Sequence, residues 1–151
     1  MTRRIVFLDF DGVLAPIRRW DRYGDLEPAC IQVLNEIVAG AGADVVVSST
    51  WRYSKTVAEL QAMLDAAGFA GRVIDKTPLG PPGADRGDEI AAWLEEHAVA
   101  GYVIVDDHPN MGALRGRLLL TDPGRGLQRA DATRAIDILM RPRPEQEPPS
   151  P

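Results

Sequence analysis

Runs of apolar residues recur along most of the chain and predict the strands of a sheet. Nearly unbroken apolar runs are typical of strands that are buried on both faces. Three such runs occur, one that begins at Ile5 and ends at Asp9 and Asp11, and two at 43–47 and 102–105. Weaker patterns predict two more strands, at 72–75 and 118–120.

Amphipathic helices are predicted between these strands. Apolar side chains recur at helical spacing in 28–38, 57–67, 90–97 and 129–140, and a helical turn is expected at 111–115. Pro28 suits a first helical turn, Thr56 with Glu59 matches a capping box, and Asp85 suits an N-cap. Because strands and helices alternate, we predict an α/β fold: a three-layer, Rossmann-like parallel sheet with helices on both faces.

The 151-residue chain is long enough for one domain with a buried core. We predict that residues 1–140 form this domain. The segment 141–151 has five prolines and no apolar periodicity, so we expect a disordered tail there. The segments after the first strand and after the second helix are short, so we expect a minimal cap domain or none.

Composition and charge narrow the possible functions. A hydrophobic share of 45% with 26% charged residues is that of a globular protein. A net charge of -5 argues against a protein that coats nucleic acid non-specifically, because that mode needs many phosphate-neutralising cations. Cys30 is the sole cysteine, so no internal disulfide can form. The first apolar run is too short for a signal peptide or a membrane span, and we therefore expect a cytoplasmic protein with no membrane partner.

Three of the predicted strands end in polar side chains. Parallel strands bring their carboxyl ends to one edge of the sheet, where ligands usually bind. The polar side chains are Asp9 and Asp11, Ser48 and Ser49, and Asp106 and Asp107. Carboxylates about 4 Å apart repel each other by roughly 4 kcal/mol per pair at an effective dielectric of about 20, so a divalent cation is almost required. Magnesium fits oxygen ligands best, whereas zinc would lack its usual cysteine and histidine ligands.

The same residues resemble the motifs of the haloacid dehalogenase (HAD) superfamily of phosphohydrolases. Asp9-Phe10-Asp11-Gly12-Val13 is similar to the first motif of this superfamily, and Asp106-Asp107 is similar to the fourth. A serine after the second strand is similar to the second motif, and a basic residue before a helix is similar to the third. The resemblance covers nearly the whole chain except the tail. Val47-Ser48-Ser49-Thr50-Trp51-Arg52 and Arg86-Gly87-Asp88-Glu89-Ile90, followed by Trp93-Leu94, further resemble the small HAD domains of multidomain RNA-repair proteins of the Swiss-army-knife type.

The resemblance implies a magnesium-dependent phosphomonoesterase that acts through an aspartyl-phosphate. Asp9 would be the nucleophile, and Asp11 would protonate the leaving oxygen and then take a proton from the attacking water. The Asp9 side chain, the Asp11 backbone carbonyl and either Asp106 or Asp107 would hold the Mg²⁺ ion. Ser48 would donate hydrogen bonds to the phosphoryl oxygens.

The resemblance also implies a basic residue that neutralises the charge developing on the phosphoryl group. Arg86 and Lys76 are the two candidates. We favour Arg86, because it precedes a helix that leads directly to the strand before Asp106, whereas Lys76 ends a weak strand before a proline-rich loop. Asp11 favours phosphate-ester chemistry over dehalogenation, since a leaving halide needs no acid.

Aromatic and basic side chains lie in the loops predicted to follow the first two strands, with Trp20, Tyr23, Trp51 and Tyr53 as the aromatic ones. Such residues can stack a base and hold a backbone phosphate, but they can equally pack a flap onto the domain. We expect the substrate-binding residues to be Gly12, Ser49, Trp51, Arg52 and Arg19. The expected partner is a phosphorylated substrate, either a nucleotide or polynucleotide end or a small metabolite, with a non-catalytic phosphate- or partner-binding module as the alternative. The sequence indicates no obligate protein partner.

Overall fold

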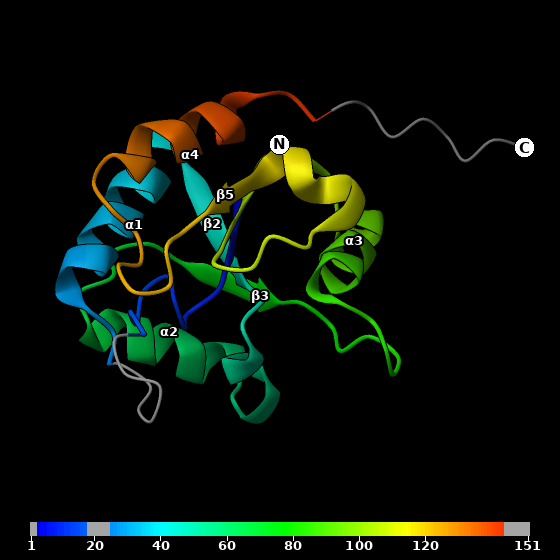
Figure 1. Cartoon of the computed structure of the whole chain (residues 1–151), viewed down its shortest axis with the longest axis horizontal. Helices are drawn as coiled ribbons and strands as arrows, with labels where there is room; N and C mark the ends of the chain where they lie inside the picture. The colour runs from blue at the N-terminus through cyan, green and yellow to red at the C-terminus, as the bar shows by residue number, and fades with distance from the viewer. Residues whose placement is uncertain (1–2, 18–24, 144–151) are drawn as a thin grey trace, which may run out of the picture.

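Five parallel strands form one sheet through the middle of the molecule (Figure 1), in the order β3-β2-β1-β4-β5. The structure, a computed structural model, describes residues 3–17 and 25–143. The strands are β1 (Arg3–Leu8), β2 (Ala43–Val47), β3 (Val73–Lys76), β4 (Val99–Asp106) and β5 (Leu118–Leu120). Every pairing between neighbouring strands is parallel, which confirms the predicted fold class.

Four α-helices cover the two faces of the sheet: α1 (Pro28–Ala41), α2 (Val57–Ala66), α3 (Arg86–Glu96) and α4 (Asp131–Met140). Capping boxes begin α2 and α3, formed by Thr56 with Glu59 and by Asp85 with Asp88. α1 ends at Gly42, whose φ of 62° is left-handed. These local signals place the helix ends close to where the sequence predicts them.

Two apolar clusters hold the helices against opposite faces of β1. Val6 and Leu8 belong to the larger cluster, which includes side chains of α1, α2 and α4. Ile5 and Phe7 belong to the other, which includes side chains of α3 and against which Leu114 of the short 3₁₀ helix η2 (Gly112–Arg117) packs. Because β1 is buried on both faces and paired on both sides, the chain that leaves it at Asp9 has a fixed position.

Some elements differ from those predicted. The segment after β2 forms a 3₁₀ helix, η1 (Thr50–Ser54), where the sequence predicts a loop. β4 begins at Val99 rather than at 102. Gly101 packs against the end of α4, where an added Cβ would lie 2.9 Å from the Arg141 carbonyl oxygen. α4 begins at Asp131 rather than at 129.

The chain stays packed on the domain just beyond α4. The Arg143 N–H donates to the Ala100 carbonyl oxygen at 2.8 Å. Arg117 donates to the carbonyl oxygens of Arg141 (3.0 Å) and Pro142 (2.9 Å). Residues 141–143 are therefore ordered parts of the fold, and the rest of the predicted tail, 144–151, lies outside the described residues.

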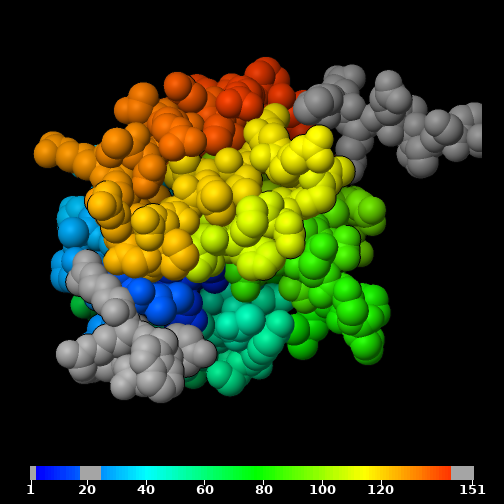
Figure 2. All heavy atoms as spheres, viewed as in Figure 1, coloured from blue at the N-terminus to red at the C-terminus, as the bar shows by residue number. Residues whose placement is uncertain are grey.

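α4, η2 and the segment after β5 cover the upper part of the face of the molecule shown in Figure 2. The described elements form the sheet or pack on it, so residues 3–17 and 25–143 contain no cap domain. None of the helices in these ranges is long and apolar enough to cross a membrane. The cytoplasmic location stays a prediction.

Candidate active site

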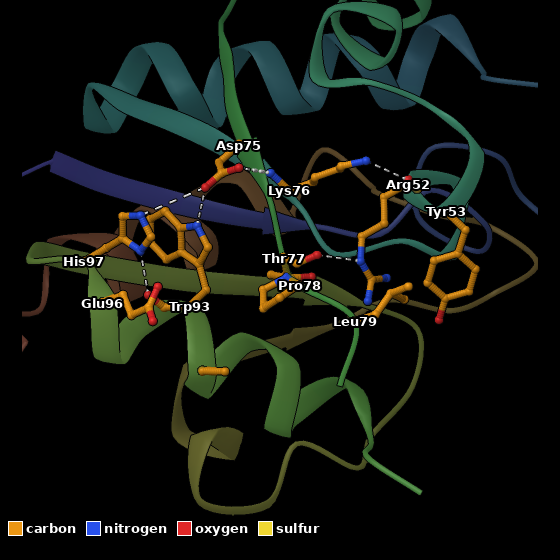
Figure 3. A pocket seen from close by; sticks show the side chains of 11 residues that line it. Arg52, Tyr53, Asp75, Lys76, Thr77, Pro78, Leu79, Trp93, Glu96 and His97 are labelled. Carbon is orange, nitrogen blue, oxygen red and sulfur yellow. Dashed lines mark hydrogen bonds and ion pairs between the residues drawn. The ribbon is translucent and has the colours of Figure 1, made fainter. Parts of the chain in front are cut away.

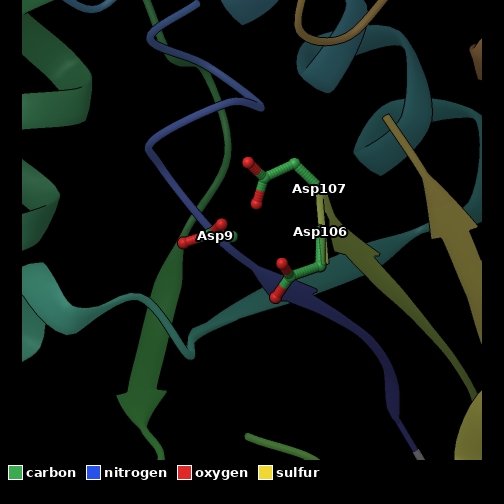
Figure 4. Close-up of side chains that lie close together, drawn as sticks. All are labelled: Asp9, Asp106 and Asp107. Atoms are coloured by element: carbon green, nitrogen blue, oxygen red, sulfur yellow. The ribbon is translucent and has the colours of Figure 1, made fainter. Parts of the chain in front are cut away.

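Three carboxylates meet at the carboxyl ends of β1 and β4. Asp9 follows β1, Asp106 is the last residue of β4, and Asp107 comes next. Leu8 pairs with Val105, so the residues that follow them lie side by side. One oxygen of each carboxylate lies within 4.8 Å of the others (Figure 4), with Asp9 and Asp106 buried and Asp107 half-buried. The sheet thus brings together acids that are far apart in the sequence.

Arg86, the first residue of α3, lies against two of these acids. Its Nη1 is 2.6 Å from Asp106 Oδ2 and 3.1 Å from Asp9 Oδ1. Burial lowers the pKa of Arg86, but the charges of Asp9 and Asp106 outweigh it and the net pKa is raised, so the guanidinium stays charged. Lys76 points elsewhere, because its Nζ donates to the carbonyl oxygens of Lys55 (2.8 Å) and Arg52 (3.1 Å). Of the two candidate cations, Arg86 is the one at the acids.

Asp9 and Asp107 are held in an environment that disfavours their negative charge. Burial, followed by the charge of Asp106, raises the pKa of Asp9 from 3.8 to about 8, with a smaller contribution from Asp107 and against the lowering effect of Arg86. Burial and the charge of Asp106 also raise the pKa of Asp107. A further cation at this place would reverse these effects.

The donor set of the cluster fits a hard divalent cation such as Mg²⁺. The three residues offer only carboxylate oxygens, which Mg²⁺ prefers, and the described part of the cluster contains no cysteine or histidine. Asp11 contributes no carboxylate to the cluster. The contact of its backbone carbonyl with the ion, which the family resemblance implies, stays a prediction.

Asp11 is held by Trp51, which lies in η1. The Trp51 indole N–H donates to Asp11 Oδ2 at 2.8 Å, and its ring meets Phe10 edge-on with centroids 5.2 Å apart. Asp11 Oδ1 is buried with no hydrogen-bond partner among the described residues. The sequence predicts substrate contact for Trp51, whereas the structure shows the ring bound to an acid of the site. Only the formation of η1, which the sequence did not predict, brings the two together.

Ser48 and Ser49 follow β2 beside Asp9, but their hydroxyls differ. Both residues are fully buried. Ser48 Oγ has no hydrogen-bond partner among the described residues, which is rare for a buried hydroxyl and suits a donor to a phosphoryl oxygen. Ser49 Oγ accepts the Trp51 N–H at 3.2 Å and caps η1. Ser49 therefore has a structural role, and its predicted contact with substrate stays a prediction.

Arg52 is buried and does not face the acids as a substrate-binding residue would. Its guanidinium donates to the carbonyl oxygens of Thr77 (2.9 Å), Ser48 (2.8 Å) and Ser49 (3.0 Å). Its Nη2 also lies 2.7 Å from Glu89 Oε1 in α3. These carbonyl groups belong to residues just after β2 and β3, where the hydrogen bonds between strands have ended. The Arg52 guanidinium therefore supplies the hydrogen-bond donors that the sheet does not. Arg52 therefore has a structural role, and substrate binding by Arg52 stays a prediction.

Gly12 allows the loop after β1 to approach Asp107 closely. Its φ is 78°, and an added Cβ would lie 2.6 Å from Asp107 Cγ. The Gly12 carbonyl oxygen accepts the hydroxyl hydrogen of Thr121 at 2.7 Å, and the Thr121 N–H donates to the Asp106 carbonyl oxygen at 2.9 Å. Sequence reasoning missed Thr121, although a polar residue directly after β5 is a signal of the same kind as Ser48. Arg19, Trp20 and Tyr23 lie outside the described residues.

Comparison with known families agrees with this geometry. A family model for the HAD domain in Swiss Army Knife RNA repair proteins matches residues 5–132. This range runs from β1 into α4 and contains all the acids described above. No curated protein matches the chain. Because the family match covers well over half of the sequence, the protein belongs to the family of HAD domains found in Swiss Army Knife RNA repair proteins.

Proposed function

We propose that the protein hydrolyses phosphate monoesters in a Mg²⁺-dependent reaction that passes through an aspartyl-phosphate on Asp9. Membership of the HAD family supports a phosphatase-like function. The main support is that three carboxylates, an arginine and a buried unpartnered hydroxyl lie at one edge of the sheet. Such a set contains a nucleophile, ligands for a cation and donors for phosphoryl oxygens.

The proposed reaction depends on the metal through the state of Asp9. Burial and the charge of Asp106 raise the pKa of Asp9 and so favour its protonated form, which cannot attack phosphorus. Asp9, Asp106 or Asp107, and the Asp11 carbonyl would hold Mg²⁺. When bound, the ion would keep Asp9 ionised and neutralise charge on the phosphoryl group.

In the first half of the reaction, a carboxylate oxygen of Asp9 forms a bond to phosphorus as the ester P–O bond breaks. Asp11 gives its proton to the leaving oxygen. Arg86 and the Ser48 hydroxyl donate hydrogen bonds to the phosphoryl oxygens as their charge grows. In the second half, Asp11 takes a proton from water, whose oxygen bonds to phosphorus as the bond to Asp9 breaks. Alcohol and inorganic phosphate are released, and Asp11 carries its proton again.

Trapping the phosphoenzyme tests this function. Acid-quenched protein that has turned over a ³²P-labelled ester in Mg²⁺ should carry label that hydroxylamine removes. Asp9→Asn should lose both label and turnover, whereas Asp137→Asn, which changes an exposed acid of α4, should keep them. If Asp9→Asn keeps activity within about tenfold of wild type, roughly 1.4 kcal/mol of barrier, Asp9 is not the nucleophile.

The favoured substrates are phosphates on nucleotides or polynucleotide ends, ahead of small-metabolite phosphates. The family description names RNA repair, and no described cap domain would exclude a bulky substrate. A phosphate-ended oligonucleotide and a panel of sugar phosphates, assayed with Mg²⁺ and with chelator, decide between the two classes. If the oligonucleotide reacts no faster than the small esters and shows no salt dependence, the nucleic-acid substrate is wrong.

A further inference from the structure

A pocket of about 530 Å³ lies along the outer edge of the sheet, apart from the three carboxylates. Figure 3 shows its walls, which come from η1, from β3 with the segment after it, and from α3. Asp9, Asp106 and Asp107 do not line it. Its volume is in the range of pockets that hold small organic ligands. The proposed reaction as described so far makes no use of it.

One end of the pocket exposes two large apolar side chains, Tyr53 (56% exposed) and Leu79 (65% exposed). They are the most exposed large apolar side chains in the described part of the chain. The Arg52 guanidinium lies 4.9 Å from the centre of the Tyr53 ring, and Arg52 is itself fixed by backbone carbonyls and Glu89. The Tyr53 ring is thus held in position while it remains open to a ligand.

The other end has an aromatic wall held by hydrogen bonds. Trp93 and His97 stack with centroids 3.8 Å apart and planes 6° apart. The Trp93 indole N–H donates to Asp75 Oδ2 at 2.7 Å. Thr77, which lies between the two ends (Figure 3), is buried, and its Oγ1 has no hydrogen-bond partner among the described residues. A ligand with an aromatic face and a polar edge would satisfy both kinds of group.

The strand ends connect the pocket to the proposed active site. The Thr77 N–H donates to the Val47 carbonyl oxygen, and the Ser48 N–H donates to that of Leu8, both at 3.0 Å. Thr77, Ser48 and Asp9 therefore follow three neighbouring strands. With strands about 4.8 Å apart, the Thr77 side of the pocket lies about 10 Å from Asp9. A substrate that places its phosphate at Asp9 can reach the pocket with a group beyond its sugar.

We propose that this pocket binds the base of a nucleotide whose phosphate lies at Asp9, an inference that rests on the function proposed above. The base would stack on Tyr53 and present its polar edge to Thr77. The charged residues that line the pocket are two acids, Asp75 and Glu96, and two cations, Arg52 and Lys76, so the pocket has no excess positive charge that would attract a second phosphate. The pocket therefore suits an uncharged aromatic ring and not a sugar phosphate alone.

Kinetics of Tyr53→Ala test the inference. Wild type and variant are compared in Mg²⁺ on adenosine monophosphate and on ribose 5-phosphate, which lacks the base. The ratio of kcat/KM for the nucleotide to that for the sugar phosphate should fall about tenfold in Tyr53→Ala, mainly through KM, because a stacking partner of the base is lost. Met140→Ala shortens another exposed apolar side chain (49% exposed), at the end of α4, and should leave the ratio unchanged. Leu79→Ser, at the same end of the pocket, provides a second variant.

Binding of adenosine, which carries no phosphate, separates this inference from the proposed function. Calorimetry should show adenosine binding to wild type, and binding at least about tenfold weaker to Tyr53→Ala. If no ester is hydrolysed, the proposed function fails, yet Tyr53-dependent adenosine binding still supports the pocket. An unchanged substrate ratio in both pocket variants, or equal adenosine affinity with and without the Tyr53 ring, would overturn it.

Discussion

Replacement of Trp51 by phenylalanine should impair proton transfer by Asp11 and leave the fold intact. The change removes the indole N–H that donates to Asp11 Oδ2 at 2.8 Å. It keeps an aromatic ring against Phe10, which Trp51 meets edge-on at 5.2 Å. Because Asp11 Oδ1 has no partner among the described residues, the Trp51 bond fixes the orientation of the carboxyl group. Without that bond, Asp11 can turn away from the leaving oxygen.

The size of the effect follows from the lost hydrogen bond. Asp11 becomes a carboxylate as it gives up its proton in the transition state, and a hydrogen bond to a charged group contributes about 1.5–3 kcal/mol, which corresponds to roughly 10- to 100-fold in rate. A poor leaving oxygen needs a proton in the transition state, whereas p-nitrophenolate needs little help from an acid. We therefore expect formation of the phosphoenzyme to slow by roughly 10- to 100-fold on an alkyl phosphate and much less on p-nitrophenyl phosphate.

Single-turnover kinetics on the two esters measure this difference, because they isolate the step in which Asp11 acts as an acid. Thermal unfolding of Trp51→Phe checks that the fold is unchanged. A double-mutant cycle with Asp11→Asn tests whether the two residues act together, since Trp51→Phe should have little further effect once the acid is gone. Equal slowing on both esters, or full additivity in the cycle, would refute the reasoning.

Three further changes test the acids and the contacts around them. In metal-free protein, the pKa of Asp9 is 3.8 in the unfolded state and about 8 in the folded state, so the folded state binds more protons between these values. The free energy of unfolding should therefore fall as the pH rises from about 4 to about 8, by up to about 1.4 kcal/mol per pH unit. In thermal unfolding, the melting temperature of Asp9→Asn should depend less on pH than that of wild type. The increase in melting temperature that Mg²⁺ gives to wild type should grow with pH. Arg52→Met should lower the free energy of unfolding by about 3–5 kcal/mol in urea titrations, because it leaves Glu89 without its cation. Adding Glu89→Gln to Arg52→Met should restore part of this stability. Gly12→Ala should abolish Mg²⁺-dependent activity, because the new Cβ would collide with Asp107 at a φ of 78°; full activity would show that Asp107 can move away.

The gathering of the acids at one edge of the sheet could be predicted because it depends only on parallel strands, whereas the strand order that makes β1 and β4 neighbours was not predicted. Buried strands have a strong apolar signal, and parallel pairing then brings Asp9 and Asp106 to the same edge whatever the loops do. The choice of Arg86 over Lys76 could be argued for a related reason. A capping box starts α3 at Asp85, so the next residue lies at the same edge of the sheet as the acids.

The inward orientation of Trp51 and Arg52 could not be predicted in this way. Aromatic and basic residues in a loop are typical of a surface that meets a ligand, and their sequence pattern is the same in either orientation. The structure turns both inward because of groups that are distant in the sequence: the Asp11 carboxylate for Trp51, and the Thr77 carbonyl and Glu89 for Arg52. Such partners become visible only once the strand ends are assembled.

Arg52 consequently links the two proposed binding sites, since it holds a residue of the first and lines the second. Its guanidinium holds the Ser48 carbonyl, and so the backbone of the residue proposed to bind the phosphate. The same group lies against the Tyr53 ring, which is proposed to bind the base. Since Arg52 is 2% exposed and paired with Glu89, the separation of these two sites is set by a buried contact and not by mobile surface side chains. The protein would then select a nucleotide over a sugar phosphate by the distance between phosphate and base, because a sugar phosphate has no base to place in the pocket.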